Sequence, residues 1–276
     1  MANVVDVTDA EVQSICQSIL TRYGIDFICY EPKSLKRRII RVINNQDLSS
    51  IHDLWVKFLR DPTFVYTFMN EISVGMTSMF RDPMLWKNLK KRMERDYLAN
   101  PLFNIWHVGC STGEEVFSMS ILLKESNMLQ MANAVATDFN QDAIAIARQG
   151  VYPKIGMIEN ENNYKNYNPL SGFDRYYKKD DNECAMDLGL INHVTFSYQN
   201  LITDPVHIPG LFDIIFCRNV MIYFDTKAKE ELLAKFYNAL KPGGYFMIGF
   251  FDTMNYLINN DRFELVDDQA KIFVRR

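Results

Sequence analysis

Apolar residues recur at helical spacing through the first hundred residues of the chain. The clearest helix is predicted between Thr8 and Gly24, with Val12, Ile15 and Ile19 on one face. Thr8 suits the N-cap of this helix, and Gly24 suits its C-cap. Four further helices are predicted over residues 32–44, 49–61, 61–72 and 82–100. This part of the chain is therefore predicted to be all helical.

The pattern changes after Pro101. Runs that are apolar on both faces predict buried parallel strands at residues 104–109, 133–138, 194–200, 212–219 and 245–250. Helical spacing appears between them at residues 112–126, 140–150 and 226–244. This alternation predicts a doubly wound, mostly parallel sheet. Residues 262–276 predict a closing hairpin that turns at Asp267-Asp268, and hence one antiparallel strand.

Residues 151–193 break the alternation. This stretch is rich in asparagine and tyrosine and has no clear period. We interpret it as an insertion between the second helix and the third strand of the sheet, with a small β excursion.

Composition and charge narrow the class of protein. The chain has 276 residues, 48% of them hydrophobic, and a formal net charge of −4, so no basic field indicates nucleic acid. No apolar run reaches the roughly 20 residues that span a bilayer. Five cysteines without a CxxC pair favour a reducing compartment, and we expect a cytoplasmic protein. The four histidines lack metal-ligand spacing, so we expect no catalytic metal.

A glycine turn follows the first predicted strand, in the sequence GCSTGEE from Gly109 to Glu115. Such turns bind nucleotides in α/β sheets. No lysine follows Gly113, which excludes a phosphate-binding P-loop, and only two glycines of a dinucleotide fingerprint are present. Glu114 and Glu115 would repel a pyrophosphate at the helix N-terminus. A nucleotide-like ligand that is cationic and lacks phosphate fits better, and S-adenosylmethionine is such a molecule.

Asp138 ends the second predicted strand, where an acid can accept both hydroxyls of a ribose. It strengthens the prediction of S-adenosylmethionine. The alternative is that Glu114 and Glu115 only complement the helix dipole.

The chain resembles the CheR family of chemotaxis receptor methyltransferases. The matching stretches are GMTSMFRD, CSTGEEVFSMSILL, ATDFNQDAIAIARQGVY, SYQNL and FDIIFCRNVMIYFD. The resemblance implies a helical N-terminal domain with linker over residues 1–82 and a class I, Rossmann-like methyltransferase domain over residues 83–276. A small β subdomain would be inserted at about residues 168–195. It also implies methyl transfer from S-adenosylmethionine to receptor glutamates, giving glutamyl methyl esters and S-adenosylhomocysteine.

The resemblance also implies roles for individual residues. Glu115 would hold the ammonium group of the cofactor beside the Gly109 turn, and Asp138 would bind its ribose. The remaining cofactor contacts would be Asn200 and Leu201 at the adenine, Arg218 and Asn219 closing over the cofactor, and Thr77 and Arg81 reaching in from the linker. Arg81 and Tyr223 would form the catalytic pair. Arg81 can orient the incoming carboxylate through its planar fork, and Tyr223 can donate a hydrogen bond near the transferred methyl.

The family implies that residues 33–45 form a receptor-docking helix for the cytoplasmic helical region of chemoreceptors. Arg38 and Arg41 lie three apart and would share the docking face. We expect a monomer that neither enters a membrane nor binds nucleic acid. Gly75 stands where the family usually has asparagine, and Gly249–Thr253 departs from its usual Gly-His-Ser-Glu.

These departures keep two alternatives open. The chain could be a regulatory module that binds S-adenosylmethionine or S-adenosylhomocysteine. It could also methylate another carboxylate.

Overall fold

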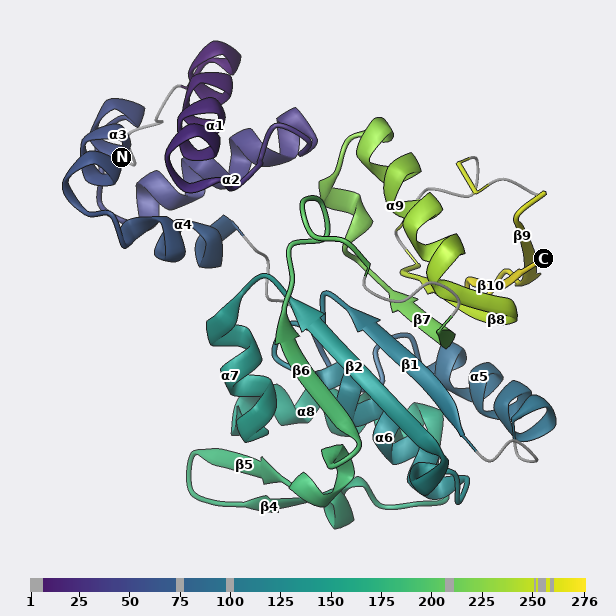
Figure 1. The fold of residues 1–276 in the computed structure, drawn as a ribbon. Coiled ribbons are helices and arrows are strands. Elements are labelled where there is room, and N and C mark those ends of the chain that lie inside the picture. The colour runs from purple at the N-terminus through teal and green to yellow at the C-terminus, as the bar shows by residue number, and fades with distance from the viewer. Residues whose placement is uncertain are drawn as a thin grey trace. The chain divides into compact units, whose positions relative to one another are not determined.

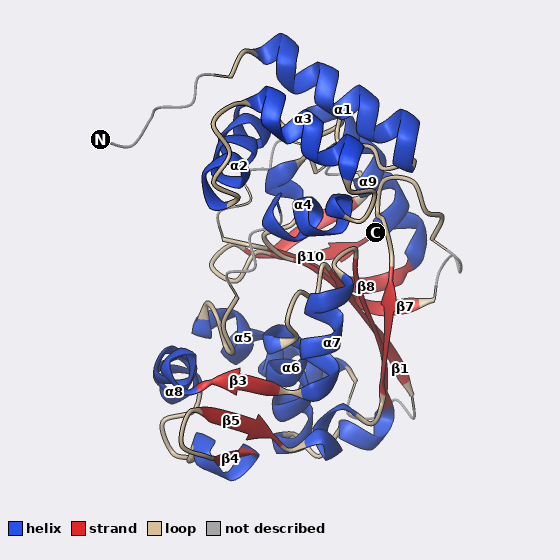
Figure 2. Ribbon diagram, turned by 90° about the vertical axis from the view of Figure 1, so that its left-hand side faces the viewer, coloured by secondary structure: helices blue, strands red, loops and turns tan. Residues whose placement is uncertain are grey.

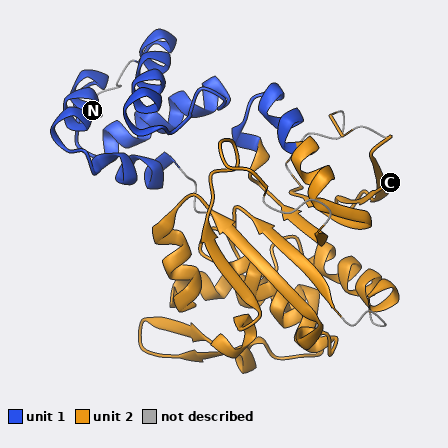
Figure 3. Cartoon of the chain, in the orientation of Figure 1, with its two compact units in different colours: residues 1–74, 222–232 blue, residues 75–221, 233–276 orange. Residues whose placement is uncertain are grey.

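The computed structural model describes residues 7–72, 77–97, 102–206, 211–250, 252, 257–258 and 261–276 (Figure 1). The chain divides into two compact units (Figure 3). Unit 1 contains residues 1–74 and 222–232, and unit 2 contains residues 75–221 and 233–276.

Unit 1 is helical, as predicted. Its N-terminal helices are α1 (Asp9–Tyr23), α2 (Pro32–Asn45), α3 (Ile51–Arg60) and α4 (Phe64–Ile72). The Thr8 side chain accepts from the Glu11 amide, and the Glu11 side chain accepts from the Thr8 amide, which forms a capping box. Gly24 closes α1 in the left-handed conformation with φ of 69°. The predicted start and end of this helix are therefore confirmed.

Residues 222–232 belong to unit 1 although they lie far along the sequence (Figure 3). Tyr30 and Phe224 form an antiparallel bridge, and their rings meet edge to face at 5.1 Å. The Asp225 amide donates to the Cys29 carbonyl at 2.8 Å. Backbone and ring contacts thus join this segment to the entrance of α2.

Unit 2 contains a seven-stranded sheet, in the order β6-β2-β1-β7-β8-β10-β9. The strands are β1 (Phe103–Val108), β2 (Ala132–Asp138), β6 (Val194–Tyr198), β7 (Phe212–Cys217), β8 (Leu240–Ile248), β9 (Phe263–Asp267) and β10 (Ile272–Arg275). The strands from β6 to β8 in this order are parallel to one another, and β10 is antiparallel to both β8 and β9. The predicted parallel sheet with a C-terminal antiparallel hairpin is confirmed.

Several helices lie wholly or partly in unit 2. They are α5 (Pro83–Asp96), α6 (Glu114–Glu125), α7 (Gln141–Gln149), α8 (Lys154–Tyr167) and α9 (Thr226–Ala239). Figure 2 shows α5, α6 and α7 on one face of the sheet. Trp86 of α5 stacks on Phe216 of β7, with ring centroids 5.8 Å apart. None of the helices in the described ranges combines the length and apolar character needed to cross a bilayer.

The sequence predicts only a small β excursion in residues 151–193, whereas the structure also has the helix α8 there. The strands β3 (Val151–Pro153), β4 (Tyr177–Lys179) and β5 (Glu183–Met186) form a separate antiparallel sheet in the order β3-β5-β4. The buried residues of α8 are Met157, Asn160, Tyr164 and Tyr167. This face is helical in spacing but partly polar, so a search for apolar periodicity missed it.

Glu125, at the end of α6, explains why the tyrosines of α8 can be buried. Its carboxylate accepts hydrogen bonds from Tyr164, from Tyr167 and Tyr176 at 3.0 Å each, and from the Asn168 amide at 3.1 Å. One carboxylate therefore anchors α8 and the residue just before β4 to α6.

Candidate active site

The candidate site lies where β1, β2 and β7 end, at one edge of the parallel sheet. Gly109 follows β1 with φ of 67°, and a Cβ atom there would lie 2.4 Å from Cγ2 of Val220. Only glycine therefore permits this close approach of the β1 and β7 loops.

Asp138 ends β2 and points its carboxylate into the turn after β1. Its Oδ2 accepts from the Ser111 amide at 2.8 Å, and its Oδ1 accepts from the Asn140 amide at 2.9 Å. Burial raises the pKa of Asp138, although these amides act in the opposite direction. Each oxygen keeps acceptor capacity beyond its amide partner.

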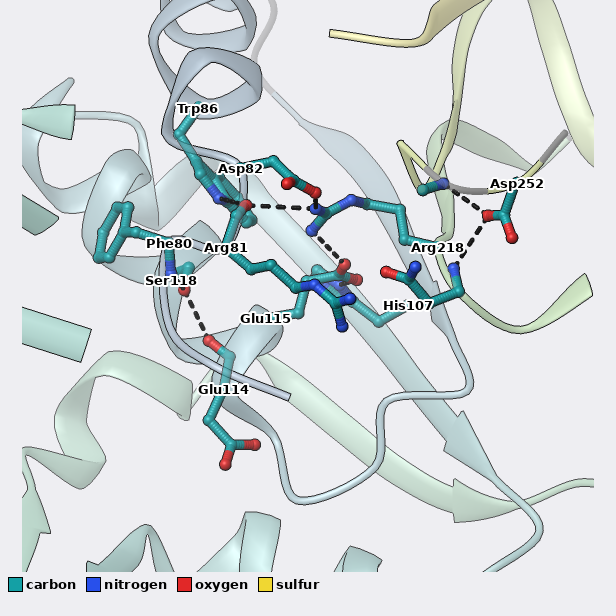
Figure 4. Close-up of polar contacts among 12 residues, drawn as sticks. Phe80, Arg81, Asp82, Trp86, His107, Glu114, Glu115, Ser118, Arg218 and Asp252 are labelled. Atoms are coloured by element: carbon teal, nitrogen blue, oxygen red, sulfur yellow. Dashed lines mark hydrogen bonds and ion pairs between the residues drawn. The ribbon is translucent and has the colours of Figure 1, made fainter. Parts of the chain in front are cut away.

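The Glu115 carboxylate, in the first turn of α6, is held by the side chains of His107 and Arg218 (Figure 4). Its Oε1 lies 3.0 Å from Nδ1 of His107, and its Oε2 accepts from Nη1 of Arg218 at 3.1 Å. Burial opposes ionisation, but the hydrogen bond from His107 and the charge of Arg218 prevail and lower the pKa of Glu115. Since an ionised carboxylate only accepts, Nδ1 of His107 carries the proton.

Arg218 connects this carboxylate to the segment before α5. Its Nη2 donates to Oδ2 of Asp82 at 2.6 Å and to the carbonyl oxygen of Arg81 at 3.2 Å (Figure 4). The Arg218 side chain is only 4% exposed. The backbone of Arg81 is thus fixed to the end of β7 by a buried guanidinium.

Backbone strain gathers around the same residues. Phe80, Asp82, Ser111 and Asn219 all have φ between 48° and 59°, although none is glycine. Such conformations cost energy and cluster at functional sites.

The β7 loop is held by a further acid. Oδ2 of Asp252 accepts from the Asn219 amide at 2.9 Å and from the Gly249 amide at 2.6 Å. A Cβ atom at Gly249 would lie 2.8 Å from the Asn219 side-chain amide. Asn219, predicted to close over the cofactor, is therefore fixed by the end of β8.

Two protein-family models together match nearly the whole chain. "CheR methyltransferase, all-alpha domain" matches residues 10–73, and "CheR methyltransferase, SAM binding domain" matches residues 75–272. The chain belongs to the CheR methyltransferase family.

Curated proteins agree with this membership. A Pseudomonas putida protein named Cher3 is 32% identical over 96% of this chain and 97% of its own length. The chemotaxis protein methyltransferases of Salmonella typhimurium and Escherichia coli are each 27% identical over 91% of this chain, and 86% and 87% of their own lengths are covered. This CheR protein is therefore an S-adenosylmethionine-dependent methyltransferase, as the sequence predicts.

The structure brings together a large part of the predicted cofactor set. Gly109, Arg218 and Asn219 lie on the loops that follow β1 and β7, Asp138 is the last residue of β2, and Glu115 lies in the first turn of α6. Arg218 binds both the Glu115 carboxylate and the Arg81 backbone. Asn200 and Leu201 follow β6, next to β2 in the sheet, and Thr77 is half-buried at the start of a described segment.

The remaining predicted residues lie in unit 1. Tyr223, Arg38 and Arg41 belong to it, and Arg38 lies over the Tyr223 ring. Gly75 and Thr253, where the sequence departs from the family, are outside the described residues.

Sequence reasoning missed three residues that shape the site. His107 is a strand residue without a metal-ligand pattern, and Asp82 resembles an ordinary residue at a helix entrance. Gln199 follows β6, and its Oε1 is buried and accepts no hydrogen bond from the described residues. The backbone amide of Gln199 donates to the backbone carbonyl of Asp138 at 2.9 Å. A residue with an open side-chain acceptor is therefore hydrogen-bonded to the predicted ribose ligand.

These residues fit S-adenosylmethionine. The carboxylates of Glu115 and Asp138 at the turn are acceptors, and the buried side-chain oxygen of Gln199, whose backbone bonds to that of Asp138, is a further acceptor. Glu115 would hold the ammonium group, Asp138 the ribose hydroxyls, and Gln199 offers an acceptor for an amine. A phosphate would meet no lysine here, and Arg218 is already engaged by two carboxylates.

Proposed function

We propose that this CheR methyltransferase transfers methyl groups to glutamate side chains of chemoreceptors and so forms glutamyl methyl esters. The main support is the match of both CheR domains over residues 10–73 and 75–272, together with the acceptor-lined turn that follows β1. Relatives of matching length are named chemotaxis protein methyltransferases.

The proposed reaction needs little acid–base catalysis by the protein. A glutamate has an ordinary pKa of about 4.3, so the nucleophile is ionised at neutral pH. S-adenosylmethionine supplies a methyl group on a positively charged sulfur. A carboxylate oxygen bonds to the methyl carbon while the carbon–sulfur bond breaks, and the electron pair stays on sulfur. The protein must align these atoms and exclude water.

We assign this alignment to Arg81 and Tyr223. The backbone of Arg81 is fixed by Arg218 and by the Trp86 indole, which donates to the same carbonyl at 2.9 Å. A fixed backbone suits a side chain that orients a carboxylate through paired N–H groups. Tyr223 would donate to the carboxylate or contact the methyl through its ring.

The helix α2 is proposed as the docking surface for the cytoplasmic helices of receptors. Arg41 is exposed, and its Nη2 donates to the Glu71 carbonyl. Lys33 and Arg37 are also exposed on α2. Their positive charge would attract an acidic methylation region.

A labelling experiment tests the proposed reaction. The protein is incubated with methyl-labelled S-adenosylmethionine and membranes that contain a chemoreceptor, and base is then added. Release of volatile methanol is expected, because methyl esters hydrolyse in base. Base-stable label would show methylation of another atom, and cofactor binding without label would show a regulatory module.

Replacement of Arg81 tests its role. Arg81→Ala is expected to abolish turnover while the dissociation constant for S-adenosylhomocysteine changes by less than about tenfold, or about 1.4 kcal/mol. Isothermal titration gives the affinity. Arg95→Ala removes an arginine that is 65% exposed on α5 and serves as the control, with activity unchanged. An active Arg81→Ala enzyme would remove Arg81 from the reaction.

A further inference from the structure

Arg38 occupies a different environment from the other basic residues of α2. Its guanidinium carbon lies 4.0 Å from the centroid of the Tyr223 ring. Its Nη1 donates to the Ile72 carbonyl, and its Nε lies 3.4 Å from the Ser34 hydroxyl. Arg38 is half-buried, whereas Arg41 on the next turn is exposed. Arg38 therefore contacts an aromatic side chain of its own unit, which Arg41 is not seen to do in the described residues.

The backbone of Tyr223 is held by the same part of unit 1. The Glu31 amide donates to the Tyr223 carbonyl at 2.9 Å. Glu31 is also the N-cap of α2, and its carboxylate accepts from the Ser34 amide at 2.7 Å. One residue thus connects the first turn of α2 to the backbone of Tyr223.

The planar guanidinium of Arg38 suits its contact with the Tyr223 ring. A cation over an aromatic face is attracted by the ring quadrupole, and a flat guanidinium can also stack on it. The hydrogen bond to Ile72 ties Arg38 to the end of α4, so the cation has a fixed position from which to restrict the ring. The Tyr223 ring and backbone are both held by residues of the N-terminal helical segment.

We propose that Arg38 is a positioning residue for Tyr223, so that the docking helix α2 and the catalytic tyrosine move as one body. The proposal rests on the proposed function, because it takes Tyr223 as the residue that meets the substrate. Arg38 would act through the orientation of the tyrosine ring, whereas Arg41 would act through contact with the receptor.

Three variants separate these roles. Arg38→Met keeps an unbranched apolar side chain but loses the charge and the plane. Arg38→Lys keeps the charge and loses the plane. Arg41→Gln removes a neighbouring charge of the same helix without touching Tyr223. Each variant is first checked for folding by its melting temperature, and affinity for S-adenosylhomocysteine is measured by titration.

The kinetic outcome is a split between kcat and KM. Arg38→Met is expected to lower kcat by about tenfold or more with KM for receptor membranes little changed. Arg38→Lys is expected to recover part of the lost kcat, because the charge beside the ring remains while the stacking plane is lost. Arg41→Gln is expected to raise KM and leave kcat unchanged. If Arg38→Met instead raised KM alone, Arg38 would be a docking residue and the proposal would be wrong.

A second readout does not depend on turnover. A single 3-fluorotyrosine at position 223 reports the ring environment by ¹⁹F NMR. Arg38→Met is expected to shift and broaden this resonance, and Arg41→Gln is expected to leave it unchanged. An unchanged resonance in Arg38→Met would overturn the proposal even if that variant lost activity through poor folding.

A double-mutant cycle completes the test. In a Tyr223→Leu background, Arg38→Met is expected to cause no further loss of kcat, because the ring through which it acts is gone. Full additivity would contradict the proposal. The proposed function fails separately, if the unmodified chain forms no base-labile ester on receptors while the ¹⁹F resonance still responds to Arg38.

Discussion

At the scale of single residues, the two consecutive acids of the glycine turn behave in opposite ways. Glu115 is bound by Arg218 and His107, and its pKa is lowered. Glu114 is buried, its carboxylate accepts from the Thr112 hydroxyl at 2.7 Å, and burial raises its pKa to about 7. One acid therefore supplies the charge of the site, whereas the neighbouring acid resists ionisation.

This difference predicts a pH dependence of stability. The folded pKa of Glu114 is about 7, above the ordinary pKa of a glutamate side chain, so the folded state keeps a proton that the unfolded chain releases. Its contribution to stability is therefore lost as pH rises from about 5 to about 7. Glu114→Gln is expected to match the original chain at pH 5 and to exceed it at pH 8 by up to about 3 kcal/mol.

Thermal melts from pH 5 to pH 8 check this prediction. Glu159→Gln removes an exposed acid of α8 and is the matched control, with no pH-dependent difference expected. Equal melting temperatures for Glu114→Gln and the original chain at pH 8 would show that Glu114 ionises freely in the folded protein.

At the scale of elements, the β1 turn depends on the missing side chain of Gly109. Gly109→Ala would place Cβ 2.4 Å from Val220 and force an alanine to φ of 67°. We expect a loss of about 2–3 kcal/mol in unfolding free energy, and weaker cofactor binding because the β1 and β7 loops separate.

Denaturant unfolding and titration with S-adenosylhomocysteine measure both effects. Gly156→Ala is the matched control: no heavy atom lies within 4 Å of its added Cβ, and it lies inside α8, so it is expected to stabilise by about 0.5–1 kcal/mol. If Gly109→Ala matched this control, the close approach to Val220 would not constrain the turn.

Elements with regular patterns could be predicted from the sequence. The cap of α1 at Thr8, the strands of the main sheet and the closing hairpin all follow from local chemistry. The helix α8 could not, because its buried face includes Asn160, Tyr164 and Tyr167, which are buried with polar partners. Glu125 makes that burial possible, and its contacts span 39 or more residues of sequence.

The site shows the same division. Gly109, Asp138 and Arg218 follow strands, so their gathering at one sheet edge was predictable. The contact between Arg218 and Asp82 joins residues 136 apart in sequence, and no local pattern indicates it. The roles assigned to Arg81 and Tyr223 remain predictions.

At the scale of the whole molecule, the chain does not divide at one point in the sequence. Residues 222–232 lie in unit 1 although the residues on both sides of them belong to unit 2. Phe224 is 5% exposed, and its ring meets that of Tyr30. The CheR domain matched to residues 75–272 therefore contains a segment that belongs to unit 1.

A fragment of residues 75–276 tests this organisation. Without residues 1–74 the fragment exposes Phe224, so Phe224→Gln is expected to increase its solubility and reduce its binding of a hydrophobic dye. In the full chain the same change removes a buried ring and is expected to cost about 3 kcal/mol in unfolding free energy. Leu170→Gln alters a side chain that is 97% exposed, so neither protein should respond to it. If Phe224→Gln improves the fragment but destabilises the full chain, residues 222–232 need residues 1–74 to bury Phe224, as a discontinuous unit requires. If the segment instead folds with residues 75–276 alone, the change should destabilise both proteins.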